Sequence, residues 1–220
     1  MHPMTKKLTT QETEALRRVS MDGAARACIA LSQMTGMDLY LTVDQVEVLP
    51  LQAVADLLGG GESKVVALLL RIYGDSRGSI LIALQPDAAA RLAAAILGRE
   101  AYPSDDAHPI EQMTELEQSG LLEMANILAS CYLNALGGVT RRSLIPSVPA
   151  LAVDMAGAIV DDLLEEAGAC GDSALVITTV LSAPEGMQGA VRGHILLLPD
   201  PLTLPDVLGA LGPHAMISGS

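Results

Sequence analysis

The feature that most constrains this chain of 220 residues is an internal repeat. With residue 16 placed on residue 121 and no gaps, LRRVSMDGAARACIALSQMTG falls on LLEMANILASCYLNALGGVTR. The same spacing places QAVADLL, 52 to 58, over GAIVDDL, 157 to 163. Further on, Pro86-Asp87 matches Pro199-Asp200, so the second copy holds about eight extra residues, APEGMQGA, in its last hairpin. A repeat of this kind restricts the chain to folds that use one supersecondary unit twice.

Each copy has the pattern of a small α+β unit: a long helix, a strand, a short helix, two strands joined by a turn, and a closing helix. In the first copy the sequence predicts a helix at 11–36, a strand at 39–48, a short helix at 50–58, strands at 63–73 and 78–85, and a helix at 87–98. The run Gly59-Gly60-Gly61 is read as a helix stop, because it lacks the context of a phosphate-binding loop. In the second copy, ALVITTVLSA and RGHILLLP repeat the hairpin.

We therefore predict a single α+β domain, residues 1–220, built from repeats at about 11–99 and 113–212. The linker between them, about 100–112, is charged and contains proline. A pseudo-two-fold axis relating the repeats would join their strands into one antiparallel sheet and set the two long helices side by side.

Composition excludes several classes of function. Half of the residues are hydrophobic, which allows a sizeable core, and the formal net charge is −13. Without a basic cluster or stacking aromatic residues, nucleic-acid binding is not expected, and neither is binding to an anionic membrane. There is no signal peptide, and no uncharged apolar run is long enough for membrane insertion, so we expect a cytoplasmic protein.

Cysteine and histidine give no sign of a disulfide framework or a metal site. The three cysteines, Cys28, Cys131 and Cys170, are far apart and odd in number. The four histidines, His2, His108, His194 and His214, show no ligand spacing. The sequence therefore predicts reduced thiols and no metal of the protein's own.

The second long helix carries a polar stripe. On a helix that turns by about 100° per residue, five polar side chains fall within one narrow wedge. These are Ser119, Glu123, Asn126, Ser130 and Asn134. The other faces are apolar, so the stripe should face solvent. Periodicity alone leaves two interpretations open, a functional surface or a plain solvated edge.

The stripe and its surroundings resemble the CheC/CheX/FliY phosphatases of bacterial and archaeal chemotaxis. The motif of that family is Asp or Ser, three residues, Glu, two residues, Asn, and a Pro about 22 residues later. It is met here by Ser119, Glu123, Asn126 and Pro149. The resemblance also includes the duplicated architecture, GAARACIALSQMTG in the first long helix and the segment PSVPALAVDMAGAI, 146–159.

The resemblance implies a CheC-like fold and hydrolysis of the phosphoaspartate of the response regulator CheY or a similar receiver domain. Asn126 would position the attacking water, and Glu123 would pair with a lysine of the regulator, with Ser119 and Pro149 as supporting motif residues. No cofactor of the protein's own is implied, because any Mg²⁺ would be supplied by the bound response regulator.

The first copy departs from the motif. Arg18 stands where the second copy has Glu123, Met21 where it has Asn126, and Asp44 where it has Pro149. A methionine cannot position water, and an arginine would repel a lysine of the regulator. We therefore expect one active site, in the second repeat, and a degenerate first site whose helix serves packing rather than a new binding role.

A non-catalytic function is the alternative. Relatives in this family include parts of the flagellar switch and adaptors that act through the receptor deamidase CheD. Asp154 lies in a segment that resembles the CheD-contacting part of CheC, although a helix N-cap is its ordinary interpretation. A switch component would carry an additional domain or a regulator-binding peptide, and neither is visible in the sequence.

Overall fold

The computed structural model describes residues 9–99, 113–167, 173–182, 189–199 and 209. The first half contains α1 (Thr10–Thr35), β1 (Tyr40–Pro50), α2 (Leu51–Leu57), β2 (Lys64–Gly74), β3 (Gly78–Leu84) and α3 (Pro86–Ile96). The second half contains α4 (Glu115–Thr140), β4 (Leu144–Pro146), β5 (Ala150–Met155), α5 (Ala156–Ala167), β6 (Ser173–Ser182) and β7 (Val191–Pro199). The predicted linker and the predicted last helix of the second repeat lie outside the described residues, as do 183–188 of the insert.

One seven-stranded sheet runs through the molecule, and all of its strand pairs are antiparallel. Its order is β1-β6-β7-β3-β2, with β4 and β5 both pairing with the outer side of β2. The first strand of each half therefore pairs with the hairpin of the other half. The α+β class and the antiparallel sheet predicted from the sequence are confirmed.

The strand registers follow the same relation between the halves. Gln45 of β1 lies opposite Thr178 of β6, just as Ala150 of β5 lies opposite Leu69 of β2. At the centre, Ile82 of β3 lies opposite Ile195 of β7. This arrangement is compatible with an internal duplication about a pseudo-two-fold axis between β3 and β7. The limits of the two repeats remain a prediction.

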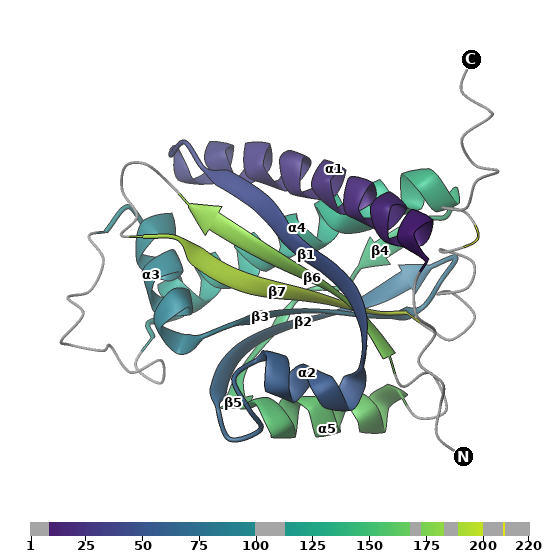
Figure 1. Ribbon diagram of the computed structural model, residues 1–220. Helices are drawn as coiled ribbons and strands as arrows, with labels where there is room; N and C mark the ends of the chain where they lie inside the picture. Colours follow the sequence, from purple (N-terminus) through teal and green to yellow (C-terminus); the bar gives the residue numbers. More distant parts are fainter. Residues whose placement is uncertain (1–8, 100–112, 168–172, 183–188, 200–208, 210–220) are drawn as a thin grey trace.

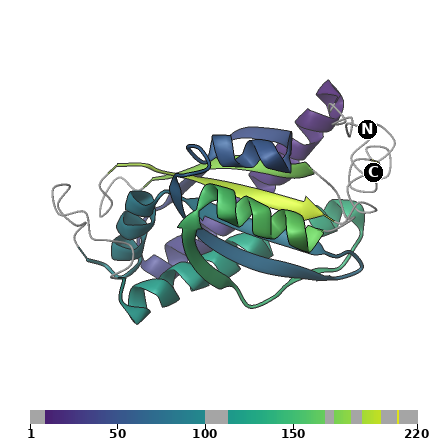
Figure 2. The ribbon, with the colours of Figure 1, turned by 90° about the horizontal axis from the view of Figure 1, so that it is seen from below.

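Helices cover both faces of the sheet. In Figure 1, α1 and α4 lie above it and α2 and α5 below it, and α1 packs directly against α4, as predicted. Figure 2, seen from below, shows α2 and α5 side by side across the other face. Alternation along β2 supplies both cores: Leu68 and Leu70 belong to the larger core with α1, α3 and α4, and Ala67 to the smaller one with α2 and α5.

The two long helices begin and end in matching ways. Thr9 and Glu12 form a capping box before α1, and Thr114 and Glu117 form one before α4. At the other end, Gly36 and Arg141 both adopt the left-handed conformation. The helix start predicted at 11 lies within one residue of the observed start of α1. No helix in the described ranges is long and apolar enough to cross a membrane.

Candidate functional site

The polar stripe of α4 faces outward, as the sequence predicted. Ser119, Glu123 and Asn134 are exposed, and Asn126 and Ser130 are half-buried. The opposite faces are buried in the larger core, through side chains such as Leu121, Met124, Ala125, Leu128 and Tyr132. Burial of those faces fixes the rotation of the helix about its own axis, so Ser119, Glu123 and Asn126 are presented together on one side.

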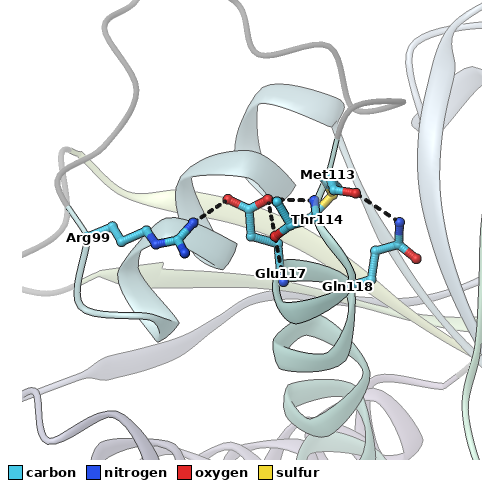
Figure 3. A network of polar contacts seen from close by, with 5 residues as sticks. All are labelled: Arg99, Met113, Thr114, Glu117 and Gln118. Atoms are coloured by element: carbon cyan, nitrogen blue, oxygen red, sulfur yellow. Dashed lines mark hydrogen bonds and ion pairs between the residues drawn. The ribbon is translucent and has the colours of Figure 1, made fainter.

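A buried carboxylate fixes the start of this helix (Figure 3). One oxygen of Glu117, Oε2, accepts hydrogen bonds from the backbone N of Thr114 at 2.8 Å and from its Oγ1 at 2.9 Å. The other, Oε1, lies 3.4 Å from Nη1 of Arg99, which follows α3. Gln118 adds a hydrogen bond from Nε2 to the carbonyl of Met113. The network anchors α4 to the end of α3, less than two turns before Glu123.

This network is a feature that the sequence analysis missed. Its signal is the run Thr114-x-x-Glu117, which predicts a helix N-terminus. The burial of Glu117, which is 1% exposed, could not be read from that signal. It depends on the packing of α3 against α4.

Pro149 lies in a loop that divides the first strand of the second repeat. The sequence predicted one strand there, but β4 ends at Pro146 and β5 begins at Ala150. Both strands pack against α4, so the loop lies at the edge of the sheet beside that helix.

The side chains of Glu123 and Asn126 are free to meet a ligand. Within the described ranges, neither has a hydrogen-bond or ion-pair partner. An ionised glutamate can only accept hydrogen bonds, whereas the amide of asparagine both accepts and donates. One turn of helix thus offers an anionic group for a cation and a neutral group that can orient a water molecule.

The matching positions of the first repeat have different chemistry. Arg18 and Met21 are exposed on α1, and Nε of Arg18 lies 4.0 Å from a carboxylate oxygen of Glu14. Asp44 sits at an irregularity of β1 and accepts a hydrogen bond from Nη1 of Arg192 at 2.7 Å. Glu and Asn are thus replaced by Arg and Met, and Met21 is more exposed than Asn126.

Asp154 is placed in β5, two residues before α5 begins. Its side chain is exposed, and Oδ1 accepts a hydrogen bond from the backbone N of Met155 at 2.7 Å. Because α5 begins at Ala156, Asp154 does not occupy the N-cap position. The first amides of α5 are instead bonded to backbone carbonyls, from Ala156 to Ser63 and from Gly157 to Gly61.

The part of the chain that the structure describes contains no cluster of three metal-ligating side chains. Of the four histidines, only His194 falls within it. Its Nδ1 lies 3.2 Å from Oγ1 of Thr178, and burial, with a smaller contribution from Arg192, lowers the pKa of the imidazole. His2, His108 and His214 lie outside the described residues.

Comparison with known proteins gives relatives over nearly the whole chain. No protein-family model matches. The CheY-P phosphatase CheC of Bacillus subtilis is 28% identical over 202 residues, which cover 92% of this chain and 94% of that protein. CheC1 of Halobacterium salinarum is 22% identical over 201 residues, with 90% and 94% covered.

Among solved structures, FliY of Thermotoga maritima superimposes with a TM-score of 0.71 over 93% of this chain and 97% of that one. At 14% sequence identity, this likeness shows a shared fold. The sequence relatives and the shared fold together confirm the resemblance of this chain to the CheC/CheX/FliY family.

Proposed function

We propose that this protein is a phosphatase that hydrolyses the phosphoaspartate of a CheY-type receiver domain. The observation that carries the proposal is the pair Glu123 and Asn126, one turn apart on the outward stripe of α4, with no partner among the described residues. The relatives named as CheY-P phosphatases, which cover 92% and 90% of the chain, support the assignment of substrate. We place the active site in the second repeat and expect the protein to work in the cytoplasm.

Hydrolysis of the phosphoaspartate requires little from the catalyst beyond the positioning of a water molecule. Hydrolysis of an acyl phosphate needs a water molecule held in line with the leaving carboxylate, and little covalent help from the catalyst. The side-chain oxygen of Asn126 accepts a hydrogen bond from that water. Its NH₂ group donates to an oxygen of the phosphoryl group, where negative charge is stabilised.

Glu123 acts through the partner protein. Its carboxylate forms an ion pair with a lysine beside the phosphoaspartate, and this pair fixes the orientation of the docked receiver domain. Mg²⁺ is held by the receiver domain, and this chain adds no metal ligand of its own. The anchored start of α4 also helps to orient the docked domain, because a fixed helix keeps the side chains of Glu123 and Asn126 in place.

The test measures how fast the phosphorylated receiver domain decays when the protein is added. We expect the wild-type protein to accelerate the decay and Asn126→Ala to lose the acceleration, at least a hundredfold, while still binding. Glu123→Gln should weaken binding, with the catalytic rate at saturation less affected.

The same helix offers a matched control. Asn134 is an exposed asparagine on the same stripe, about two turns beyond Asn126. We expect Asn134→Ala to keep full activity. Equal losses in the two variants would contradict the catalytic role of Asn126. A wild-type protein that binds the receiver domain without accelerating its decay would instead support a non-catalytic adaptor.

A further inference from the structure

The loop between β4 and β5 presents an apolar side chain to solvent. Val148 is 88% exposed, more than any other large hydrophobic residue in the described part of the chain. It directly precedes Pro149, which belongs to the candidate motif. An isolated exposed valine needs no explanation by itself, but the restrained loop that displays Val148 does need one.

The first repeat shows what the same residue does in an undivided strand. At the spacing that aligns the two long helices, Val148 matches Val43. Val43 lies within the continuous β1 and is 9% exposed, packed into the larger core. In the second repeat, prolines at 146 and 149 flank the corresponding position, and the strand opens into a loop. The same residue type is thus buried in one half and displayed in the other.

Hydrogen bonds hold the loop in this open form. The backbone N of Ser147 donates to the carbonyl of Arg71 at 2.8 Å, and the hydroxyl of Ser147 accepts from the backbone N of Arg71 at 2.9 Å. The serine side chain thereby takes the place of a backbone carbonyl opposite β2. With both neighbours of Val148 restrained, by these bonds and by the ring of Pro149, little conformational entropy is lost when Val148 meets a partner.

We propose that Val148 is the apolar docking contact through which the protein recognises a folded receiver domain. This inference rests on the proposed function and names how its substrate is recognised. Val148 stands on a loop whose flanking strands pack against α4, and Glu123 and Asn126 stand on that helix, so a protein surface can meet all three. Small acyl phosphates cannot use the loop.

The occupant follows from the continuity of the loop with the candidate site. Pro149 directly follows the displayed valine and belongs to the same candidate motif as Glu123 and Asn126, and the strands on either side of the loop pack against α4. A cavity of about 430 Å³ lies on the other face of the sheet against α5, and neither Glu123 nor Asn126 lines it. An open surface flanked by a raised apolar side chain suits a protein partner better than an enclosed small molecule.

The experiment compares Val148→Ser with Ile29→Ser. Ile29 is also an exposed β-branched residue, 63% exposed, but it lies on α1 in the first repeat. The decay of a phosphorylated CheY-type receiver domain is followed at several concentrations of that domain. We expect Val148→Ser to raise KM about tenfold with kcat unchanged, since burial of one valine contributes to docking but not to water positioning. Ile29→Ser should behave as wild type.

Two further measurements separate the possible failures. Titration with the receiver domain carrying Mg²⁺ and beryllofluoride should show the same tenfold loss of affinity for Val148→Ser, and acetyl phosphate should not be hydrolysed by the wild-type protein. An unchanged KM for Val148→Ser, with activity still lost in Asn126→Ala, would overturn the docking role and leave the proposed function standing. Hydrolysis of acetyl phosphate at a rate like that of the receiver domain would overturn the substrate class. No acceleration by the wild-type protein would overturn both the inference and the proposed function.

Discussion

At the scale of single residues, the two capping boxes show how burial changes the importance of the same local motif. Glu12 and Glu117 make equivalent hydrogen bonds to Thr9 and Thr114. Glu12 does so near solvent, whereas Glu117 is 1% exposed and also lies 3.4 Å from Arg99. Removing a buried carboxylate leaves its donors without an acceptor, and water cannot readily replace it.

We expect Glu117→Ala to lower the free energy of unfolding by about 2 kcal/mol and Glu12→Ala by about 0.5 kcal/mol. Urea unfolding followed by circular dichroism measures both. The two substitutions remove the same side chain from the same helix position, so the difference isolates the buried environment. Equal losses would show that the contact with Arg99 and the burial of Glu117 contribute nothing.

The candidate site also shows what the sequence could predict at this scale. The outward direction of Ser119, Glu123 and Asn126 followed from helical periodicity, because the surrounding apolar residues could only face the core. The exposure of Val148 could not be predicted. Val43 and Val148 are the same residue type at matching positions, but the loop that displays Val148 is held by hydrogen bonds between Ser147 and Arg71, which are far apart in the sequence.

At the scale of elements, close packing of α1 against α4 depends on a small residue facing a large one. A Cβ atom added to Gly23 of α1 would lie 3.1 Å from both Cα and Cδ1 of Tyr132. Tyr132 is 6% exposed, and burial raises the pKa of its phenol. Its hydroxyl has no hydrogen-bond partner among the described residues. The ring therefore contributes through packing against α1.

We expect Gly23→Ala to lower the free energy of unfolding by about 2 kcal/mol, because the backbone of α4 must move to admit the methyl group. Gly138→Ala provides the control. An added Cβ there meets nothing within 4 Å, and alanine is the better helix former, so stability should rise by about 0.5–1 kcal/mol. Thermal unfolding of both variants measures the two changes in stability. Stabilisation by Gly23→Ala would mean that the two helices are not closely packed at this point.

Sequence periodicity predicted most elements of the first half closely. The helix predicted at 11–36 is observed as Thr10–Thr35, and the strand predicted at 63–73 as Lys64–Gly74. The divided strand of the second half was not predicted. Prolines can lie at strand edges or end a strand, and the sequence alone does not distinguish these outcomes. The choice here depends on β2, which bonds to β4, to Ser147 and to β5 in turn.

At the scale of the whole molecule, the exchange of strands makes each half dependent on the other. Within the described ranges, β1 pairs only with β6, and β4 and β5 pair only with β2. Without the second half, the first half would retain a single hairpin, β2 with β3, and an unpaired β1. A two-stranded hairpin is marginally stable in water, and the apolar face of α4 that covers the larger core would be missing.

We therefore expect fragments 9–99 and 113–220 not to fold separately, and to form a native-like complex when they are mixed. Circular dichroism and urea unfolding of each fragment should show no cooperative transition, whereas the equimolar mixture should unfold cooperatively and elute as one species in gel filtration. Cooperative unfolding of either fragment by itself would contradict the dependence of the halves on each other.

The mixture of fragments also tests the proposed function, because α4 and its polar stripe come from one fragment and the β2 strand that holds the Val148 loop comes from the other. If phosphatase activity is present, it should therefore return only when both fragments are combined.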